Sequence, residues 1–448
     1  MDYIPQILFL ILLVAGVGYF TRNIRRVIRN IKLGRDPGEF DQKGKRWAQM
    51  ARVAIGQSKM VKRPVAGALH IIVYLGFVLI NIEVLEIIID GLFGTHRVFG
   101  FLGGTYGFLI GAFEILAFLV LVSVIIFYIR RHWIHIKRFH ARELFGWPKT
   151  DADIILYAEM VLMTLFLVMN AADYQLQLNG ADHYFEAEAG IRGAFPISQY
   201  VAPLLSGFSD TTLVWIERGA WWLHIAGILV FLNYLYFSKH LHIMLAFPNV
   251  WMAKVEPQGE FNNLESVKKE VALMMDPSAD PFAAPDPAAD GDGEPERFGA
   301  ADIFDLNQVQ LLNAYTCTEC GRCTSECPAN ITGKLLSPRK IMMDTRDRLE
   351  EVGKVINEKG KWEDDGKMLL NDHIKPEELW ACTTCNACVE ACPIGINPLS
   401  IILDMRRYLV MEQSAAPNEL NVTMSNIENN GAPWPYNQMD RLNWANEN

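Results

Sequence analysis

The sequence has no cysteine outside two short segments in its last third, and this absence limits the chemistry of the chain. All eight cysteines lie in "CTECGRCTSECP", residues 317–328, and "CTTCNACVEACP", residues 382–393. None is left for scattered disulfides, so a secreted disulfide framework is not expected. Reduced thiols indicate a reducing compartment, which we take to be the cytoplasm.

Sequence motifs typical of nucleic-acid binding and of nucleotide binding are also missing. No basic, aromatic-interleaved motif stands out, and the net charge of −10 argues against a nucleic-acid partner. A nucleotide-binding glycine fingerprint is absent too, because "GFLGG" at residues 100–104 lies in an apolar segment where helix packing explains it better. We therefore expect neither nucleic-acid nor nucleotide binding.

Long apolar runs are absent after about residue 250. The hydrophobic content of 51% and the mean hydropathy of +0.12 come from residues 1–250, whereas residues 251–448 are polar and acidic in patches. Such a division predicts a membrane domain followed by a domain in water.

The first half is rich enough in apolar residues for several membrane spans, each of which needs about 20 residues. The first run is interpreted as a retained anchor helix and not as a signal peptide, because basic residues follow it and none precedes it. Five spans are predicted, at about 4–20, 65–89, 99–129, 153–172 and 213–238.

Charge sets the expected orientation of these spans. Residues 21–63 contain thirteen Lys or Arg and residues 130–149 contain six, whereas 90–98 and 173–211 contain one each. The excess of basic residues in cytoplasmic loops predicts an outer N-terminus and a cytoplasmic location for everything after residue 240. The expected setting is the cytoplasmic (inner) membrane of a prokaryotic cell.

An acidic Pro- and Ala-rich linker is predicted at 251–300, because "DPSADPFAAPDPAADGDGEPERFG" buries too little apolar surface to fold. A small helical domain is expected at 301–412 and a tail at 413–448. Ser337 and Pro338 should begin the main helix of that domain. The fold class is therefore all-α, a five-helix membrane bundle followed by a dicluster domain.

The cysteine spacing, C-x-x-C-x-x-C-x-x-x-C-P used twice, favours [4Fe-4S] clusters over zinc. Zinc takes four ligands, usually from two C-x-x-C pairs. In tandem ferredoxin motifs, three close thiolates bind one cluster and the fourth, before proline, binds the other. The predicted ligand sets are Cys317, Cys320, Cys323 and Cys392 for the first cluster, and Cys382, Cys385, Cys388 and Cys327 for the second.

Histidines in membrane helices are costly and therefore functional candidates. His70 lies early in the second span, and His224 lies in the fifth. His224 and His242 are 18 residues apart, which equals five helical turns, so we expect them on one face of one helix. Inward-facing histidines of helical bundles commonly ligate haem b. The second span offers only His70, and Ile80 occupies the place where a second histidine would be expected.

The "LH" in span two and the "LHIMLAFP" after span five resemble the cytochrome b subunit of respiratory nitrate reductase and its relatives beside heterodisulfide reductases. The resemblance implies that His70 and His242 bind one haem b and that His224 is the span-five ligand of a second. His224 then has no span-two partner. His96 or a methionine could supply the missing ligand of this haem, or His224 could contact quinone instead of haem.

Residues 300–412, with "SPRKI", "WACTTCNACVEACP" and "MRRYLV", resemble the iron-sulfur subunit of heterodisulfide reductases and its membrane-bound bacterial relatives. Many such relatives carry a further module with paired cysteines that performs the chemistry, and the resemblance implies that a separate cytoplasmic iron-sulfur or flavoprotein subunit supplies it. The tail then docks that partner, or is an ordered extension.

These features predict an electron-transfer subunit that links a cytoplasmic redox partner, two [4Fe-4S] clusters and haem b to the membrane quinone, expected to be menaquinone. The relatives suggest an electron-transfer-flavoprotein:quinone or heterodisulfide reductase-like complex, with the catalytic site on another chain. The alternative is a haem-free, membrane-tethered dicluster adaptor or sensor with structural histidines.

Overall fold

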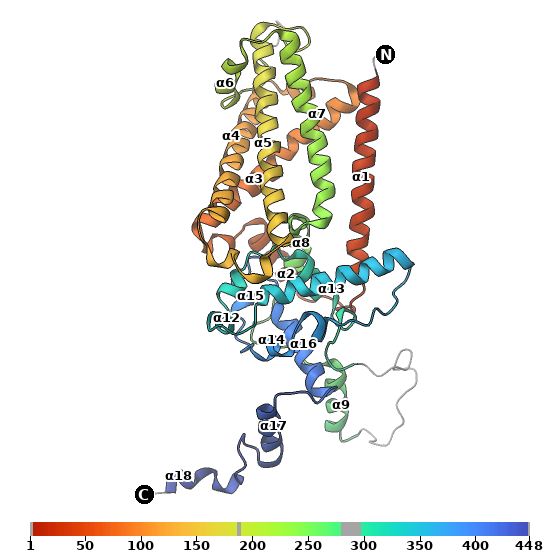
Figure 1. Ribbon diagram of the computed structural model, residues 1–448, viewed down its shortest axis with the longest axis vertical. Coiled ribbons are helices and arrows are strands. Elements are labelled where there is room, and N and C mark those ends of the chain that lie inside the picture. Colours follow the sequence, from red (N-terminus) through yellow and green to blue (C-terminus); the bar gives the residue numbers. More distant parts are fainter. Residues whose placement is uncertain (1–2, 186–189, 279–296, 447–448) are drawn as a thin grey trace.

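The computed structural model describes residues 3–185, 190–278 and 297–446, and these residues form helices and loops with no β-strand. Long helices stand side by side in one half of the molecule (Figure 1). Shorter helices form a second domain beneath them, and the C-terminal residues extend away from this domain. The all-α prediction is therefore confirmed for the described ranges.

Five helices are long and apolar enough to cross a membrane. Many of their large apolar side chains are exposed, as a lipid environment requires. The five predicted spans are thus confirmed, as α1 (Ile4–Ile31), α3 (Pro64–Phe93), α4 (Gly104–His132), α5 (Trp147–Asn179) and α7 (Asp210–Tyr234).

The third span begins later than the predicted residue 99. Residues Val98–Leu102 form a short 3-10 helix, η3, and Gly103 then has φ +56° and ψ −125°. A side chain is disfavoured in that conformation, so the chain turns at this glycine before α4 begins.

The fifth span ends earlier than the spacing of its histidines suggested. Helix α7 stops at Tyr234, one 3-10 turn follows (η7, Leu235–Phe237), and Ser238 is extended with φ −115° and ψ 145°. Another short turn (η8, Lys239–Leu241) leads into α8 (His242–Met252). The expectation that His224 and His242 share a face of one helix is therefore wrong, because the helix axis is broken between them.

The second domain is built mainly around α13 (Pro338–Lys359), which crosses beneath the bundle (Figure 1). The Ser337 hydroxyl accepts a hydrogen bond from the Lys340 amide, and Pro338 occupies the first turn, so the predicted start of this helix is confirmed. The other helices of the domain are α10 (Gln308–Thr316), α11 (Arg322–Ser325), α12 (Pro328–Ile331), α14 (Pro376–Trp380), α15 (Ala387–Ala391) and α16 (Pro398–Met411).

The connections contain the remaining helices. Residues 279–296, most of the predicted flexible linker, lie outside the described residues. The start of that linker contacts the second domain, because the Gln258 carbonyl accepts a hydrogen bond from Asn386 at 3.1 Å. The short elements are α2 (Lys43–Met50), η1 (Ala51–Ile55), η2 (Met60–Lys62), η4 (Lys137–Phe139), η5 (Arg142–Leu144), α6 (Ser198–Val201), η6 (Ala202–Leu205), α9 (Glu265–Met275), η9 (Ile303–Asp305), η10 (Leu369–His373), α17 (Asn418–Asn430), η11 (Gln438–Leu442) and α18 (Asn443–Asn446).

The two domains share one hydrophobic core. Val27 of α1, Leu235 and Leu241 are buried in the same apolar cluster as Leu311 and Ile341 of the second domain. The first helix also continues well past residue 20, where the predicted span ended, and its last turn reaches this domain. There Asn30 donates to the Tyr315 hydroxyl at 2.8 Å.

Candidate redox centres

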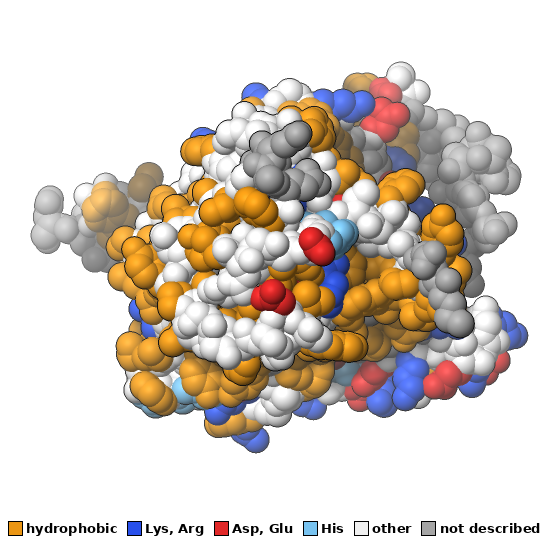
Figure 2. Space-filling view, turned by 90° about the horizontal axis from the view of Figure 1, so that it is seen from above, with side chains coloured by type: hydrophobic (Ala, Val, Ile, Leu, Met, Phe, Trp, Pro, Cys, Tyr) orange, Lys and Arg blue, Asp and Glu red, His pale blue; other side chains and the backbone are white. Residues whose placement is uncertain are grey.

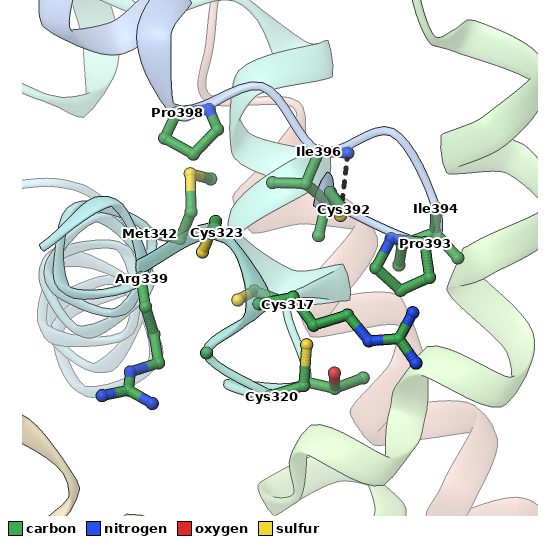
Figure 3. Close-up of a pocket in the computed structure, with 13 residues that line it drawn as sticks. Cys317, Cys320, Cys323, Arg339, Met342, Cys392, Pro393, Ile394, Ile396 and Pro398 are labelled. Carbon is green, nitrogen blue, oxygen red and sulfur yellow. Dashed lines mark hydrogen bonds between the residues drawn. The ribbon is translucent and has the colours of Figure 1, made fainter. Parts of the chain in front are cut away.

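Four cysteines surround one cavity in the second domain. The loop between α10 and α11 contributes Cys317 and Cys320, and the first turn of α11 contributes Cys323. The fourth, Cys392, directly follows α15. Figure 3 shows the side chains of these cysteines around a common space. The structure thus brings together the four residues that the sequence assigned to the first cluster.

The loop of the first motif needs its glycine. Gly321 has φ +71°, and a Cβ atom there would lie 2.5 Å from Nη1 of Arg339 and 3.4 Å from Cβ of Arg138. A larger residue would therefore push the cysteine loop away from α13 and from the membrane domain.

A second cavity is lined by Cys382, Cys385 and Cys388 of the second motif and by Cys327 of the first. Thr384 and Asn386, between these cysteines, have φ +55° and +59°. The small or short polar residues between the cysteines allow this tight winding. Each cavity therefore takes three cysteines from one motif and the fourth from the other.

Backbone amides point at the sulfurs. The Ile396 N–H donates to Sγ of Cys392 at 3.3 Å, a bond drawn in Figure 3, and the Thr384 N–H donates to Sγ of Cys382 at 3.4 Å. Hydrogen bonds of this kind stabilise thiolates and tune the potential of bound iron-sulfur clusters.

The donor set fits a cluster better than a single ion. Among the described residues, no group of three or more His, Cys, Asp or Glu is placed to hold one metal ion. Burial raises the pKa of Cys317 and of Cys388 to about 12 and that of Cys392 to about 11. Thiols in such an environment become ligands only when the charge of iron displaces their protons.

Three histidines gather where the bundle meets this domain. The rings of His240 and His242 lie 5.4 Å apart. Burial, with smaller contributions from the charges of His242 and of His70, lowers the pKa of His240 to about 3. The bend after α7 therefore brings His242 to the same end of the bundle as His70.

The orientation of His242 suits a ligand. Its Nδ1 lies 3.1 Å from the Lys239 carbonyl, and a proton on Nδ1 leaves Nε2 free to bind metal. In His70, Nδ1 is buried without a hydrogen-bond partner.

His224 lies apart from these residues, buried between α5 and α7. Its Nδ1 is 3.0 Å from the Leu162 carbonyl, and its ring is 5.9 Å from that of Phe166. His96 does not reach it, because His96 contacts Asp173, which is eleven residues, about 16 Å, farther along α5 than Leu162. The structure thus does not bring His96 to His224.

Ion pairs that sequence reasoning missed fix the cysteine domain to the bundle. The Lys239 ammonium pairs with Glu319, which lies between Cys317 and Cys320. Glu319 also pairs with Arg346 at 2.6 Å. Since the Lys239 carbonyl holds His242, this lysine contacts both the histidine cluster and the first cysteine loop.

A second set of contacts involves Arg339, which is 0% exposed. Its guanidinium donates to Oε1 of Glu143 at 2.7 Å and to the Arg138 carbonyl at 2.8 Å. The "SPRKI" motif contains Arg339, but nothing in the sequence names its partner 196 residues away.

Arg322 lies on the side of the first cavity that faces the membrane domain. It lines the cavity and donates to the Lys59 and Met60 carbonyls at 3.3 and 3.4 Å. Residues 60–62 precede α3, the helix that carries His70. A buried positive charge therefore lies between the first cysteine cavity and the start of that helix.

Comparison with known proteins agrees with this geometry. Residues 316–396 match the 4Fe-4S dicluster domain family. The chain is 30% identical over 471 residues to the probable iron-sulfur-binding oxidoreductase FadF of Bacillus subtilis, an alignment that covers 98% of the chain and 61% of FadF.

Two further relatives are similar. The EtfAB:quinone oxidoreductase of Syntrophomonas wolfei is 27% identical over 424 residues, covering 88% of the chain and 53% of that protein. One subunit of the ferredoxin/F(420)H(2)-dependent CoB-CoM heterodisulfide reductase of Methanosarcina acetivorans is 31% identical over 128 residues, covering 28% of the chain and 65% of that polypeptide. No solved structure matches.

The chain spans between half and two thirds of the length of the two relatives that match most of it. It carries a 4Fe-4S dicluster domain, and its relatives support the role of an electron-transfer iron-sulfur subunit in the membrane.

Proposed function

We propose that this chain carries electrons between a cytoplasmic redox partner and the membrane quinone pool. The observation that carries the proposal is the exchange of cysteines between the two cavities. Each cavity is lined by three cysteines of one motif and the last cysteine of the other. Such an exchange is the ligation pattern of two adjacent [4Fe-4S] clusters.

The proposed ligands are therefore Cys317, Cys320, Cys323 and Cys392 for one cluster and Cys382, Cys385, Cys388 and Cys327 for the other. When bound, the clusters and a haem would accept and release single electrons. The chain contributes a small domain that holds both cavities in one core with the inner end of α1.

The proposed haem ligands are His70 and His242. The arrangement after the bend at Ser238 supports this pairing, because His242 then lies close enough to His70 of α3 to act on it electrostatically. The hydrogen bond from Nδ1 to the Lys239 carbonyl fixes the ring of His242 as metal-binding histidines require. His224 has an equivalent bond to Leu162, which supports a second haem or a quinone contact there.

The orientation proposed from the basic loops places the cysteine domain in the cytoplasm, where a soluble partner can reach it. The relative named EtfAB:quinone oxidoreductase supports an electron-transferring flavoprotein as the partner class and a quinone, such as menaquinone, as the membrane substrate. The catalytic site of the complex would then lie on the partner.

Spectroscopy of the purified full chain tests the proposal. We expect iron and acid-labile sulfide for two [4Fe-4S] clusters and a reducible b-type absorption band. A preparation with full cluster content and no b-type band would leave a haem-free dicluster adaptor as the correct interpretation.

Single substitutions test the proposed haem ligands and the proposed cluster ligands independently. His70→Ala should remove haem and leave both clusters, whereas His135→Ala, an exposed histidine in the loop after α4, should change neither. Cys392→Ser should abolish the first cluster, although Cys392 belongs to the second motif. Loss of the second cluster instead would contradict the proposed exchange.

A further inference from the structure

The half of the bundle farthest from the cysteine domain contains a group of buried polar side chains that the proposed electron path does not use. They come from α3, α4, α5 and the loop between α3 and α4. Each is less than one tenth exposed, although ionisable groups in a membrane domain are costly. The group consists of Glu83, Glu86, Asp90, Arg97, Tyr106, Glu114, Asn170 and Asp173.

Arg97 organises one side of this group. Its Nε donates to Asp173 at 2.5 Å, its Nη1 to the Tyr106 hydroxyl at 3.1 Å and its Nη2 to Asn170 at 3.0 Å. Asp173 therefore balances the guanidinium charge, and Arg97 keeps its proton.

Glu86 and Asp90 are also satisfied by hydrogen bonds. Glu86 accepts from the Tyr106 hydroxyl and from the Phe99 N–H, both at 2.8 Å. Asp90 accepts from the backbone N–H groups of Arg97 and Val98. These two carboxylates are held as structural acceptors at the outer ends of the helices.

Glu83 and Glu114 differ from the others because each has a buried oxygen without a partner. Oε2 of Glu83 and Oε1 of Glu114 make no hydrogen bond. The other oxygen of Glu114 accepts from the N–H groups of Ile197 and Ser198, at 3.0 and 3.1 Å. Glu83 is 4% exposed and Glu114 is 0% exposed.

The charges around Glu83 cannot all be compensated. Those that act on it are the carboxylates of Glu86, Glu114 and Asp173 and the guanidinium of Arg97, which Asp173 already neutralises. A buried carboxylate without a partner is more stable with a proton than with a charge. Glu83 and Glu114 are therefore the acids of this group whose oxygens the surrounding side chains satisfy least.

The depth of the pair matches a membrane-soluble ligand. Glu83 is ten residues from the outer end of α3 and Glu114 is ten residues from the outer end of α4, or about 15 Å along each helix. The lipid-facing surfaces of these helices are apolar, with Leu85 and Ile115 52% and 46% exposed. A quinone in the bilayer could approach at this depth.

We propose that Glu83 and Glu114 form the proton-exchange site for an isoprenoid quinone that binds between the outer halves of α3 and α4. The inference rests on the proposed function. Reduction of the quinone takes two electrons from the chain and two protons, which convert its two carbonyl groups to hydroxyls. In that direction the two carboxyl groups pass protons to the quinone, and they accept protons when quinol is oxidised.

The rest of the group lies between the pair and the outer end of the bundle. Glu86 lies one helical turn from Glu83, and its bond to Tyr106 leads to Arg97 and Asp173. Asp173 is 3.6 Å from Nε2 of His96. Figure 2, which views this end of the molecule, shows acidic side chains, a histidine and a basic side chain near the centre of a mostly apolar face. Polar groups thus extend from the level of Glu83 toward the outer end of the bundle.

The test uses the full chain with its clusters and haem, reduced by dithionite and mixed with a short-chain menaquinone analogue. Glu83→Gln and Glu114→Gln should each slow quinone reduction about a hundredfold, the usual contribution of a general acid, while dithionite still reduces haem and clusters fully. The infrared band of a protonated carboxyl should disappear in at least one of these variants.

Glu217→Gln is the matched control. Glu217 lies at the same end of the bundle and is 1% exposed, but Tyr184 and Arg218 hydrogen-bond both of its oxygens. Glu217→Gln should therefore leave the rate of quinone reduction and the infrared band of the protonated carboxyl unchanged. If the wild-type protein reduces quinone and both glutamine variants match it, the assignment of the proton site is wrong. If the wild-type protein does not reduce quinone, the proposed function itself is wrong.

Discussion

At the scale of single residues, Gly321 decides how closely the first cysteine loop approaches the rest of the protein. Its positive φ and the 2.5 Å approach of a Cβ atom to Arg339 both oppose a side chain. We predict that Gly321→Ala destabilises the domain by about 1–3 kcal/mol and lowers the occupancy of the first cluster. Thermal unfolding and iron content would measure both effects.

Gly333 provides the control for this substitution. It has φ +84°, but a Cβ atom there would meet nothing within 4 Å. Gly333→Ala should therefore cost only the conformational strain, about 1 kcal/mol, and leave both clusters in place. Equal cluster loss in the two variants would show that the contact with Arg339 is irrelevant.

Arg322 should influence the potential of the first cluster. It is 6% exposed and lines the first cavity, where a positive charge stabilises added electrons. Arg322→Gln should lower the midpoint potential of that cluster by about 60 mV, which corresponds to a tenfold change in the equilibrium constant for one electron. A redox titration followed by electron paramagnetic resonance would measure it, and an unchanged potential would exclude this role.

At the scale of elements, the loop after α4 fastens α13 to the membrane domain through Glu143 and Arg339. Burial alone would raise the pKa of Glu143, but the hydrogen bond and charge of Arg339 outweigh it and hold this pKa below the usual range. Glu143→Gln leaves the buried guanidinium without its counter-charge, so we predict a loss of about 3–5 kcal/mol in the stability of the docked domain. Thermal melts of wild type and variant would measure the difference.

The sign of the pH dependence follows from the depressed pKa. The ion pair contributes its full stability above the ordinary glutamate pKa of about 4.3 and loses it as the pH falls through the lower folded value. The difference between wild type and Glu143→Gln should therefore be constant near neutrality and shrink below about pH 4.3. A difference that grew on acidification would contradict this assignment.

At the scale of the whole molecule, the distribution of basic residues makes the orientation testable. An epitope inserted after Gly207, in an exposed loop where a Cβ atom would meet nothing within 4 Å, should be accessible only from the outer side. An epitope after Gly431, in the C-terminal tail, should be accessible only from the cytoplasm. Labelling of intact cells and of inverted vesicles would distinguish the two, and reversed accessibility would overturn the orientation and the proposed partner side together.

Much of this molecule could be predicted from local sequence patterns. Hydropathy located the five long helices, and Ser337 with Pro338 located the start of α13. The apolar run ends at Ser238, as predicted, but the extended conformation there could not be predicted, because neighbouring residues stabilise it. The Ser238 hydroxyl accepts from the His240 N–H, and the Lys239 N–H donates to Asp151 of α5.

The contacts between buried ionisable side chains could not be predicted from the sequence either. Glu114 is a single acid in an apolar run, Glu83 shares its run with Glu86 and Asp90, and Arg97 is one of few basic residues on its side. Only the packing of α4 against α3 and α5 places them in one group. A residue of this kind is recognisable in the sequence as costly, but its partner is a property of the fold.

The hydrogen bond between Asn30 and Tyr315 has a consequence for how the protein is made. Its two residues are separated by 285 positions, and Asn30 is 2% exposed. At about 5–20 residues per second, the ribosome reaches Tyr315 about 15–60 s after it has passed Asn30. During this interval the Asn30 side chain at the end of the first helix is exposed to water at the membrane surface. It becomes buried only when the second domain has been synthesised and has folded against the helix.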